Sequence, residues 1–181
     1  MKRLLFTLAT CCVMCACEQK TEINPFFTEF QTEYGAPDFT KIRLEHYEPA
    51  FLKGIEEQNA EIKAIVDNPE EPTFENTIVA LDKSGGILAR VSGVFFALTE
   101  ADTNDSLTAL NEKMAPVLSE HSDNIYLNQD LYKRVADVHQ QEKEGKITLT
   151  TEQHRLLDKY YKAFVPVSYT HLRAHETLRH L

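Results

Sequence analysis

The residues best suited to metal chemistry lie close to the C-terminal end of the sequence. His175, Glu176 and His180 have the residue types of the helix that binds zinc in many peptidases. That helix places its two histidines four residues apart, so that both rings share one face and bind one ion. Here the spacing is five residues. At about 100° per residue the two rings would point about 140° apart. The spacing therefore argues against a metal site in this segment.

The other polar residues show no catalytic pattern. The histidines of the body are spread along the chain without the spacing that would bring two onto one helix face, namely His46, His121, His139 and His154. We interpret each as a surface or packing residue. No Ser, Cys or Thr stands in a recognisable nucleophile elbow. Gly85 and Gly86 lack the Lys-Ser/Thr ending and the preceding strand of a phosphate-binding loop. We therefore predict neither catalytic nor metal-ligating residues in this chain, and no bound cofactor.

All four cysteines lie near the N-terminus, at Cys11, Cys12, Cys15 and Cys17. The body therefore has neither a disulfide framework nor a cysteine-based zinc knuckle. Lys2 and Arg3 precede an apolar stretch, Leu4–Ala16. This stretch is shorter than the about 20 residues that a membrane-spanning helix needs. It has the length and flanks of the apolar region of a secretory signal.

Cys17 is the predicted lipidation site. It follows Met14-Cys15-Ala16, which resembles a bacterial lipobox with Met14 in place of the usual Leu. Cys11 is a weaker competitor, and an ordinary cleaved signal peptide is the alternative. We predict that residues 1–17 are a lipoprotein-type signal peptide and that the protein lies in the bacterial cell envelope, membrane-anchored or periplasmic. Acyl chains, at about 0.8 kcal/mol per buried methylene, would hold it to the membrane without a spanning helix.

Length and charge limit the classes of protein further. The chain has 181 residues, 43% hydrophobic and 26% charged, which suits one domain or part of a larger one. Its formal net charge is −9. Without residues 1–17 the balance is 17 basic to 28 acidic residues, or −11. Nucleic-acid binders normally carry a basic stripe, so this balance argues against nucleic acid as a partner.

The elements that must carry these residues are predicted to be helices, in an all-α fold. Residues 18–46 contain Pro25, Gly35 and Pro37 and are predicted to be a tether and irregular lead-in. From Tyr47 to residue 165 apolar residues recur at helical spacing, and the first helix ends before Pro69. No stretch keeps the strict alternation of a strand. Short loops imply that neighbouring helices run roughly antiparallel.

Helix starts can be assigned from capping residues. Side chains that cap helix N-termini stand at Thr73, at Asn104 or Asp105, at Asn128 and at Thr150. Gln153 completes a capping box with Thr150. Gly85-Gly86 interrupts the helix that begins after Thr73, which predicts a kink or a close helix crossing there.

The composition changes abruptly after Val165. Residues 166–181 hold three of the seven histidines and a single acidic residue, whereas residues 18–165 have 15 basic and 27 acidic residues. The segment resembles foreign sequence of the kind found at the ends of translated sequence fragments. We interpret residues 166–181 as such an artefactual tail. A genuine short basic end is the alternative.

The body resembles the N-terminal region of bacterial peptidyl-dipeptidases, in the thimet-oligopeptidase and oligopeptidase A family of zinc metallopeptidases. The resemblance covers about residues 24–165. It is carried by short stretches in the same order, which are Asn24–Phe27, Glu45–Phe51, Asn68–Leu81, Val91–Phe96, Ala115–Asp123 and Leu156–Tyr161.

This resemblance implies an all-helical protein whose zinc lies on a His-Glu-x-x-His helix far downstream. It implies that the N-terminal helices help to wall a channel that admits short peptides. It also implies that the full-length enzyme removes dipeptides from the C-terminal ends of these peptides. Zinc is expected in the full-length parent, and no catalytic residue or zinc ligand of the family maps onto this chain. The leading hypothesis is therefore the non-catalytic N-terminal part of a lipid-anchored peptidyl-dipeptidase, inactive by itself. The alternative is a stand-alone helical envelope lipoprotein that acts as a binding module.

Overall fold

The structure is a computed structural model that describes residues 23–178, with side chains described to residue 164. The predicted signal peptide, Cys17 and His180 lie outside the described residues, and so does the side chain of His175. All regular elements within 23–178 are helices, which confirms the all-α prediction. None of these helices is long and apolar enough to cross a membrane.

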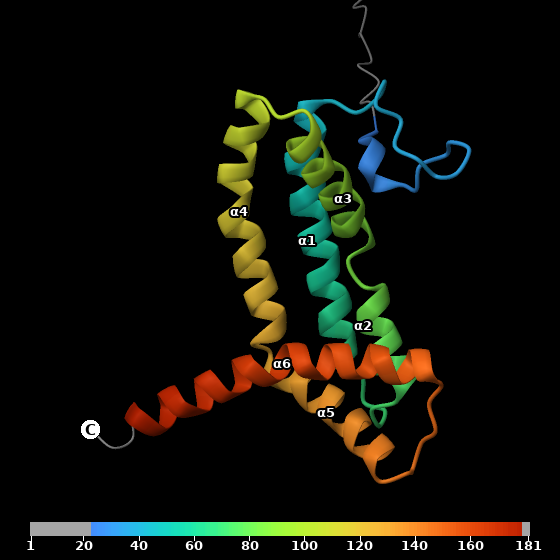
Figure 1. Cartoon of the computed structure of the whole chain (residues 1–181), viewed down its shortest axis with the longest axis vertical. Helices are drawn as coiled ribbons and strands as arrows, with labels where there is room; N and C mark the ends of the chain where they lie inside the picture. The colour runs from blue at the N-terminus through green and yellow to red at the C-terminus, as the bar shows by residue number, and fades with distance from the viewer. Residues whose placement is uncertain (1–22, 179–181) are drawn as a thin grey trace, which may run out of the picture.

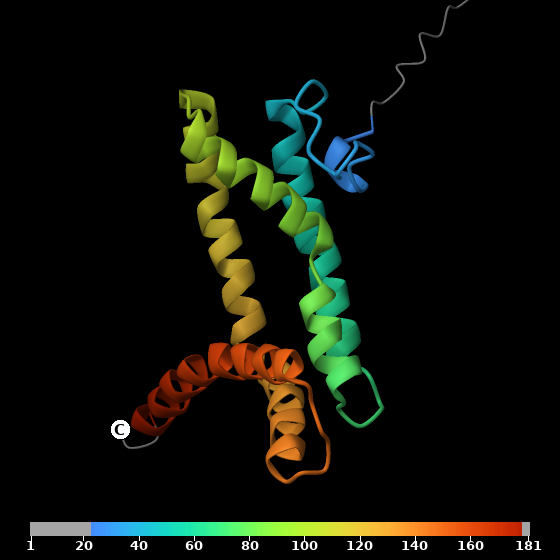
Figure 2. The same ribbon diagram turned by 45° about the vertical axis from the view of Figure 1, so that its right-hand side comes forward.

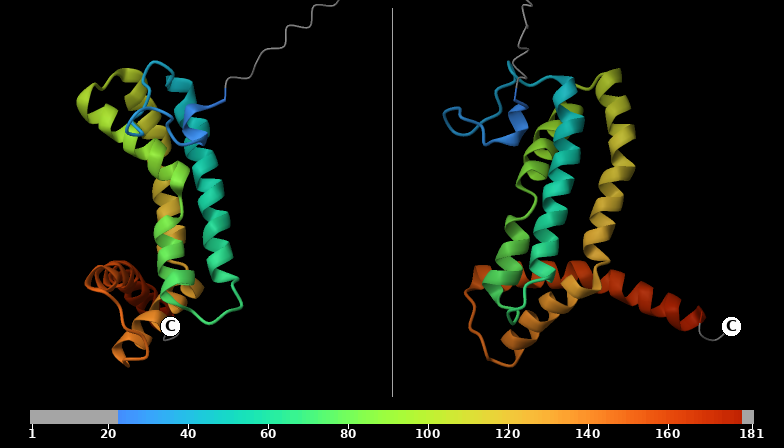
Figure 3. Two further views of the ribbon diagram at one scale, coloured as in Figure 1. Left: turned by 90° about the vertical axis from the view of Figure 1, so that its right-hand side faces the viewer. Right: turned by 180° about the vertical axis from the view of Figure 1, so that it is seen from behind.

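The described elements follow one another with short connections. In chain order they are the 3-10 helix η1 (Pro25–Phe27), α1 (Leu44–Val66), the π-helix η2 (Phe74–Val79), α2 (Ala80–Lys83), α3 (Gly86–Ala101), α4 (Asp105–Tyr126), α5 (Gln129–Lys143) and α6 (Thr151–Leu178). The chain runs down α1, back up through α2 and α3, and down again through α4 (Figure 1). Helix α6 runs across the lower end of these helices, and α5 lies below it (Figure 2). The last turns of α6 extend away from the rest (Figure 3).

Local capping chemistry determines where most helices begin. The side chain of Asn104 accepts a hydrogen bond from the Leu107 amide, and that of Asn128 accepts one from Leu131. Thr150 Oγ1 accepts from the Gln153 amide at 3.3 Å, and Gln153 Oε1 accepts from the Thr150 amide at 3.0 Å. These caps satisfy amides that have no partner inside the helix. The predicted caps at these positions are confirmed, with Asn104 chosen over Asp105.

One helix start and one helix type differ from the sequence pattern. Helix α1 begins at Leu44, three residues before the predicted Tyr47. His46 Nδ1 accepts a hydrogen bond from the Arg43 amide at 3.1 Å and so serves as part of the cap. Thr73 caps the next helix as predicted, through a reciprocal pair of hydrogen bonds with Asn76. The turns that follow are the wider π form, η2, before the chain tightens into α2.

Two glycines permit a close approach of α1 to α3. At Gly85 the backbone is left-handed, with φ +75°, and the chain turns there from α2 into α3. A Cβ atom at Gly54 of α1 would lie 2.7 Å from the backbone nitrogen of Leu88 in α3. The predicted break at Gly85-Gly86 is confirmed. The close approach of one helix backbone to another, however, occurs at Gly54, which the sequence pattern did not single out.

The buried side chains form two clusters rather than one. The N-terminal core joins the upper parts of α1, α3 and α4 to η1, with Phe26, Tyr47, Ala50, Phe51, Val91, Val94, Phe95, Leu107 and Met114. The C-terminal core lies where α5 and α6 cross the lower ends of α1, η2, α2 and α4, with Ile62, Ile65, Phe74, Ile78, Leu81, Ile125, Leu131, Val135, Val138, Leu157, Tyr160 and Phe164. Helices α1 and α4 contribute to both clusters and hold them together.

Candidate functional site

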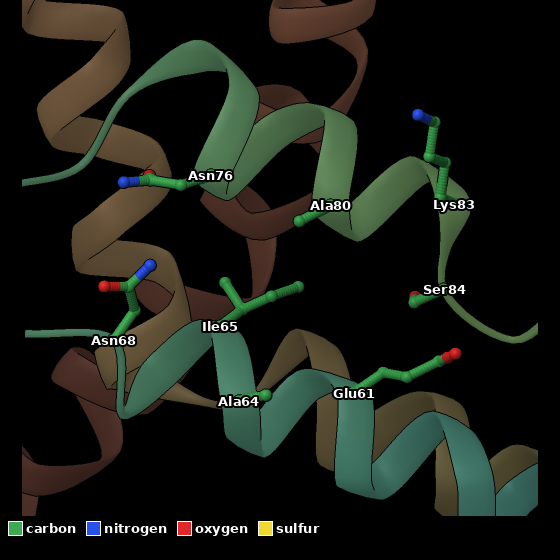
Figure 4. Close-up of a pocket in the computed structure, with 8 residues that line it drawn as sticks. All are labelled: Glu61, Ala64, Ile65, Asn68, Asn76, Ala80, Lys83 and Ser84. Carbon is green, nitrogen blue, oxygen red and sulfur yellow. The ribbon is translucent and has the colours of Figure 1, made fainter. Parts of the chain in front are cut away.

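A pocket lies between the C-terminal half of α1 and the helical segment η2–α2. Its volume is about 360 Å³, and it is lined by Glu61, Ala64, Ile65, Asn68, Asn76, Ala80, Lys83 and Ser84 (Figure 4). Residues from two consecutive helical segments, joined by the short connection 67–73, thus face each other across it. Its mixture of a carboxylate, amides and a hydroxyl makes it the natural place to look for a binding or catalytic group.

The polar groups of this pocket hold the backbone together. Glu61 Oε2 accepts a hydrogen bond from the Gly85 amide at 2.7 Å. Ser84 Oγ donates to the Leu81 carbonyl oxygen at 2.8 Å and accepts from Gln58 Nε2 at 3.2 Å. These bonds tie the turn between α2 and α3 to α1. A nucleophile needs a neighbouring base, whereas the hydroxyl of Ser84 is bonded to a carbonyl oxygen and an amide. The arrangement supports a structural role.

Each of the four histidines of the body contacts a different partner. His46 caps α1, as described above. His121 Nε2 lies 2.7 Å from Gln58 Oε1, and burial lowers the pKa of this histidine. The ring of His139 stacks on Tyr161 with centroids 3.7 Å apart, and its pKa is lowered first by burial and then by the charge of Lys143. His154 Nδ1 lies 2.8 Å from Glu142 Oε1. Each histidine therefore has a packing or surface partner.

The family resemblance implies a zinc ion, and these contacts show whether the described residues could bind one. Within residues 23–164 no three His, Cys, Asp or Glu side chains converge as a metal site would require. The histidine nitrogens named above are engaged on different helices and with different partners. The described residues therefore do not fit a zinc ion.

Arg134 is a site residue that the sequence analysis missed. It is only 9% exposed, and its Nη1 donates to the carbonyl oxygens of Asn68 and Glu70 at 2.9 and 3.3 Å. Its Nη2 donates to Asn76 Oδ1 at 3.3 Å. The guanidinium thus holds the connection between α1 and η2. A signal was present, because Arg134 stands three residues after Leu131 and next to Val135, inside the apolar register of α5.

A second, more apolar groove lies between α1 and α4. It has a volume of about 670 Å³ and is lined by Leu44, Glu45, Glu48, Pro49, Leu52, Ala109, Leu110 and Lys113. Lys113 Nζ lies 2.7 and 2.8 Å from the two carboxylate oxygens of Glu48. The groove offers apolar surface and one exposed ion pair, which suits packing against another surface better than chemistry on a small molecule.

Comparison with known proteins places the chain in a family. No protein-family model matches it. It is 43% identical over 145 residues, or 80% of its length, to the dipeptidyl carboxypeptidase of Escherichia coli, and 43% identical over 142 residues to that of Salmonella typhimurium. It is 27% identical over 141 residues to the oligopeptidase A of Escherichia coli.

The matched residues span only about a fifth of the length of these relatives, 20–21% of each. The similarity extends over most of the helical body, and it is stronger to dipeptidyl carboxypeptidase than to oligopeptidase A. The chain therefore belongs to the peptidase family of dipeptidyl carboxypeptidase and oligopeptidase A, in which it corresponds to an N-terminal part.

Proposed function

We propose that this chain is the non-catalytic, helical N-terminal part of a zinc-dependent peptidase that removes dipeptides from the C-terminal ends of short peptides. The observation that carries the proposal is the 43% identity to dipeptidyl carboxypeptidase over 145 residues. The polar groups around the pocket support it, because Glu61, Ser84 and Arg134 bond to backbone groups of turns and connections. In this role the helices form a rigid wall, and the zinc and its catalytic carboxylate belong to the remainder of the enzyme.

We further propose that the protein is held at the bacterial envelope membrane through lipidated Cys17. Support comes from the order of a basic start, a short apolar run and a cysteine after apolar and small residues. Radiolabelled fatty acid should be incorporated into the protein in a bacterial host, and Cys17→Ser should abolish the label. Label that persists in Cys17→Ser would refute the assignment of this cysteine.

A chimera tests the peptidase role. The stretch of the Escherichia coli dipeptidyl carboxypeptidase that matches this chain is replaced by the corresponding residues of this chain. We expect the chimera to release C-terminal dipeptides in a chelator-sensitive reaction. The same enzyme with the stretch deleted is the negative control, and we expect it to be inactive because its channel wall is missing.

The isolated chain provides the complementary measurement. Peptide hydrolysis by a zinc enzyme needs a bound ion with an open position and an adjacent base. We expect no stoichiometric zinc after dialysis and no chelator-sensitive cleavage of short peptides by the 181-residue chain.

A folded but inactive chimera would contradict the role as a peptidase part and favour a stand-alone binding module. Cleavage by the isolated chain would contradict its non-catalytic character.

A further inference from the structure

The exposed apolar side chains of the described protein are concentrated at one end. Within residues 23–164, seven large hydrophobic side chains are exposed, and five of them fall within residues 23–44. These five, which we call the N-terminal apolar surface, are Ile23, Phe27, Tyr34, Phe39 and Leu44. Scattered exposed hydrophobic residues are normal, but a concentration of them indicates a contact surface.

Several contacts place this surface at the upper end of α1. Asn24 Nδ2 donates to the His46 carbonyl oxygen at 2.7 Å, which fixes η1 beside the first turn of α1. Phe39 and Leu44 line one pocket of about 510 Å³ together with residues from the start of α4. The loop that carries Tyr34 projects from this same end of the molecule (Figures 1 and 3). The end that α5 and α6 cross is the opposite one.

The loop presents its aromatic ring to the outside by an unusual backbone. Tyr34 has φ +74°, and it is the only residue other than glycine with a positive φ in the described part of the chain. The turn is closed by the Gly35 amide, which donates to the Thr32 carbonyl oxygen at 3.1 Å. The Tyr34 side chain is 94% exposed. Tyrosine and phenylalanine are suited to the boundary between lipid and water, because the ring is apolar and the tyrosine hydroxyl remains hydrated.

We infer that the N-terminal apolar surface rests on the lipid bilayer to which Cys17 is anchored. The inference depends on the proposed lipidation. Residues 18–22 separate Cys17 from Ile23. At about 3.3–3.6 Å per residue, the connection reaches at most about 22 Å. The bilayer surface must then lie within that distance of Ile23, and the end of the molecule that carries the apolar side chains is the end that faces it.

Charge favours the same orientation. Residues 23–44 carry two basic and three acidic groups, whereas residues 45–164 carry 12 basic and 22 acidic groups. The strongly acidic helices would be repelled by anionic lipid headgroups, and the nearly neutral end would not. The contact therefore depends on apolar side chains, and it should be insensitive to salt.

Tryptophan fluorescence tests the contact directly, because the chain contains no tryptophan. Phe39→Trp and Tyr34→Trp each introduce a single reporter into the full lipidated protein. The probe is a phosphatidylethanolamine and phosphatidylglycerol vesicle, with or without brominated acyl chains. We expect a blue-shifted emission that brominated lipid quenches, unchanged between low and high salt. Lys133→Trp, at an exposed position on α5, is the control and should show neither effect.

The outcomes separate the surface from the anchor. Suppose that the fatty-acylated protein binds vesicles but that brominated lipid quenches neither the Tyr34→Trp nor the Phe39→Trp variant. That result would overturn the docking surface and leave the anchor in place. A blue shift without bromine quenching would indicate a protein partner or a second copy, and would also overturn it. Absence of fatty-acid incorporation would overturn both the anchor and the bilayer contact.

Discussion

At Gly54 the described helix α1 packs directly against the backbone of α3. A methyl group there would meet the backbone nitrogen and Cα of Leu88 at 2.7 and 2.9 Å, so helices α1 and α3 would have to move apart. Gly93 also stands in a helix interior, in α3, but apart from its chain neighbours and its own helix backbone no described atom lies within 4 Å of its would-be Cβ. Alanine substitutions at the two glycines therefore make a matched pair. Both change helix propensity in the same way, but only the one at Gly54 forces a methyl group against another helix.

We expect Gly54→Ala to lower the free energy of unfolding by about 1–3 kcal/mol, as overpacking does. Gly93→Ala should raise it by about 0.5–1 kcal/mol, because alanine loses less backbone entropy in a helix. Urea denaturation followed by circular dichroism measures both. Equal stabilisation by the two substitutions would show that α1 and α3 do not cross closely at Gly54.

Tyr160 should make stability depend on alkaline pH. Burial, and then the hydrogen bond from its hydroxyl to Asp82 Oδ1 at 2.9 Å, raise its pKa above the ordinary value of 10.0. Above pH of about 10 the unfolded chain loses the phenol proton while the folded chain keeps it. The free energy of unfolding contributed by this group is fully present below that pH and falls as pH rises, by up to about 1.4 kcal/mol per pH unit.

The comparison of wild type with Tyr160→Phe isolates this group from other titrating residues. Denaturation midpoints measured between pH of about 9 and about 11.5 should fall less steeply in Tyr160→Phe. Tyr34→Phe is the control, since the Tyr34 side chain is 94% exposed and its replacement leaves the buried core unchanged. Parallel curves for wild type and Tyr160→Phe would contradict the buried phenol.

At the scale of elements, the connection between α1 and η2 depends on a residue from α5. Arg134→Ala would leave the carbonyl oxygens of Asn68 and Glu70 without their guanidinium donor. We expect a loss of about 1–3 kcal/mol in the free energy of unfolding, together with faster proteolytic cleavage within residues 67–72. Lys133→Ala, on the exposed side of α5, should change stability by less than about 0.5 kcal/mol. Unchanged cleavage in Arg134→Ala would refute the role of Arg134 in holding this connection.

The contrast between caps and long-range contacts shows what the sequence could predict. Thr73, Asn128 and the Thr150–Gln153 pair act on amides three residues away, so these caps can be predicted from the local sequence. The Gly54–Leu88 contact and the burial of Phe26 join segments far apart in the chain. Nothing in the local pattern determines such contacts, and the same holds for the partners of Arg134 and of His121.

At the scale of the whole molecule, two separate cores predict unfolding in two parts. Phe95 is fully buried in the N-terminal core and packs edge-on against Phe51, with centroids 5.4 Å apart. Leu157 is fully buried in the C-terminal core. Phe95→Ala should cost about 3–5 kcal/mol and Leu157→Ala about 2–5 kcal/mol, each mainly in its own region.

Hydrogen exchange by mass spectrometry distinguishes the regions. In Phe95→Ala, amides of α3 should lose protection while those of α5 keep it, and Leu157→Ala should give the reverse. Wild-type protein should then show a broad thermal transition, because the two regions need not melt at one temperature. A uniform loss of protection in both variants would mean that the two cores unfold as one unit.

The division of the core also has a consequence for the order in which the chain matures. Any polypeptide emerges from the ribosome, and from a membrane translocation pore, with its N-terminus first. The buried side chains of the N-terminal core extend no further along the chain than Met114, whereas the C-terminal core needs residues up to Phe164. The N-terminal core can therefore pack while many residues of the C-terminal core have not yet emerged from the ribosome or the pore. The incomplete C-terminal core would then be the stage at which a chaperone has apolar surface to bind.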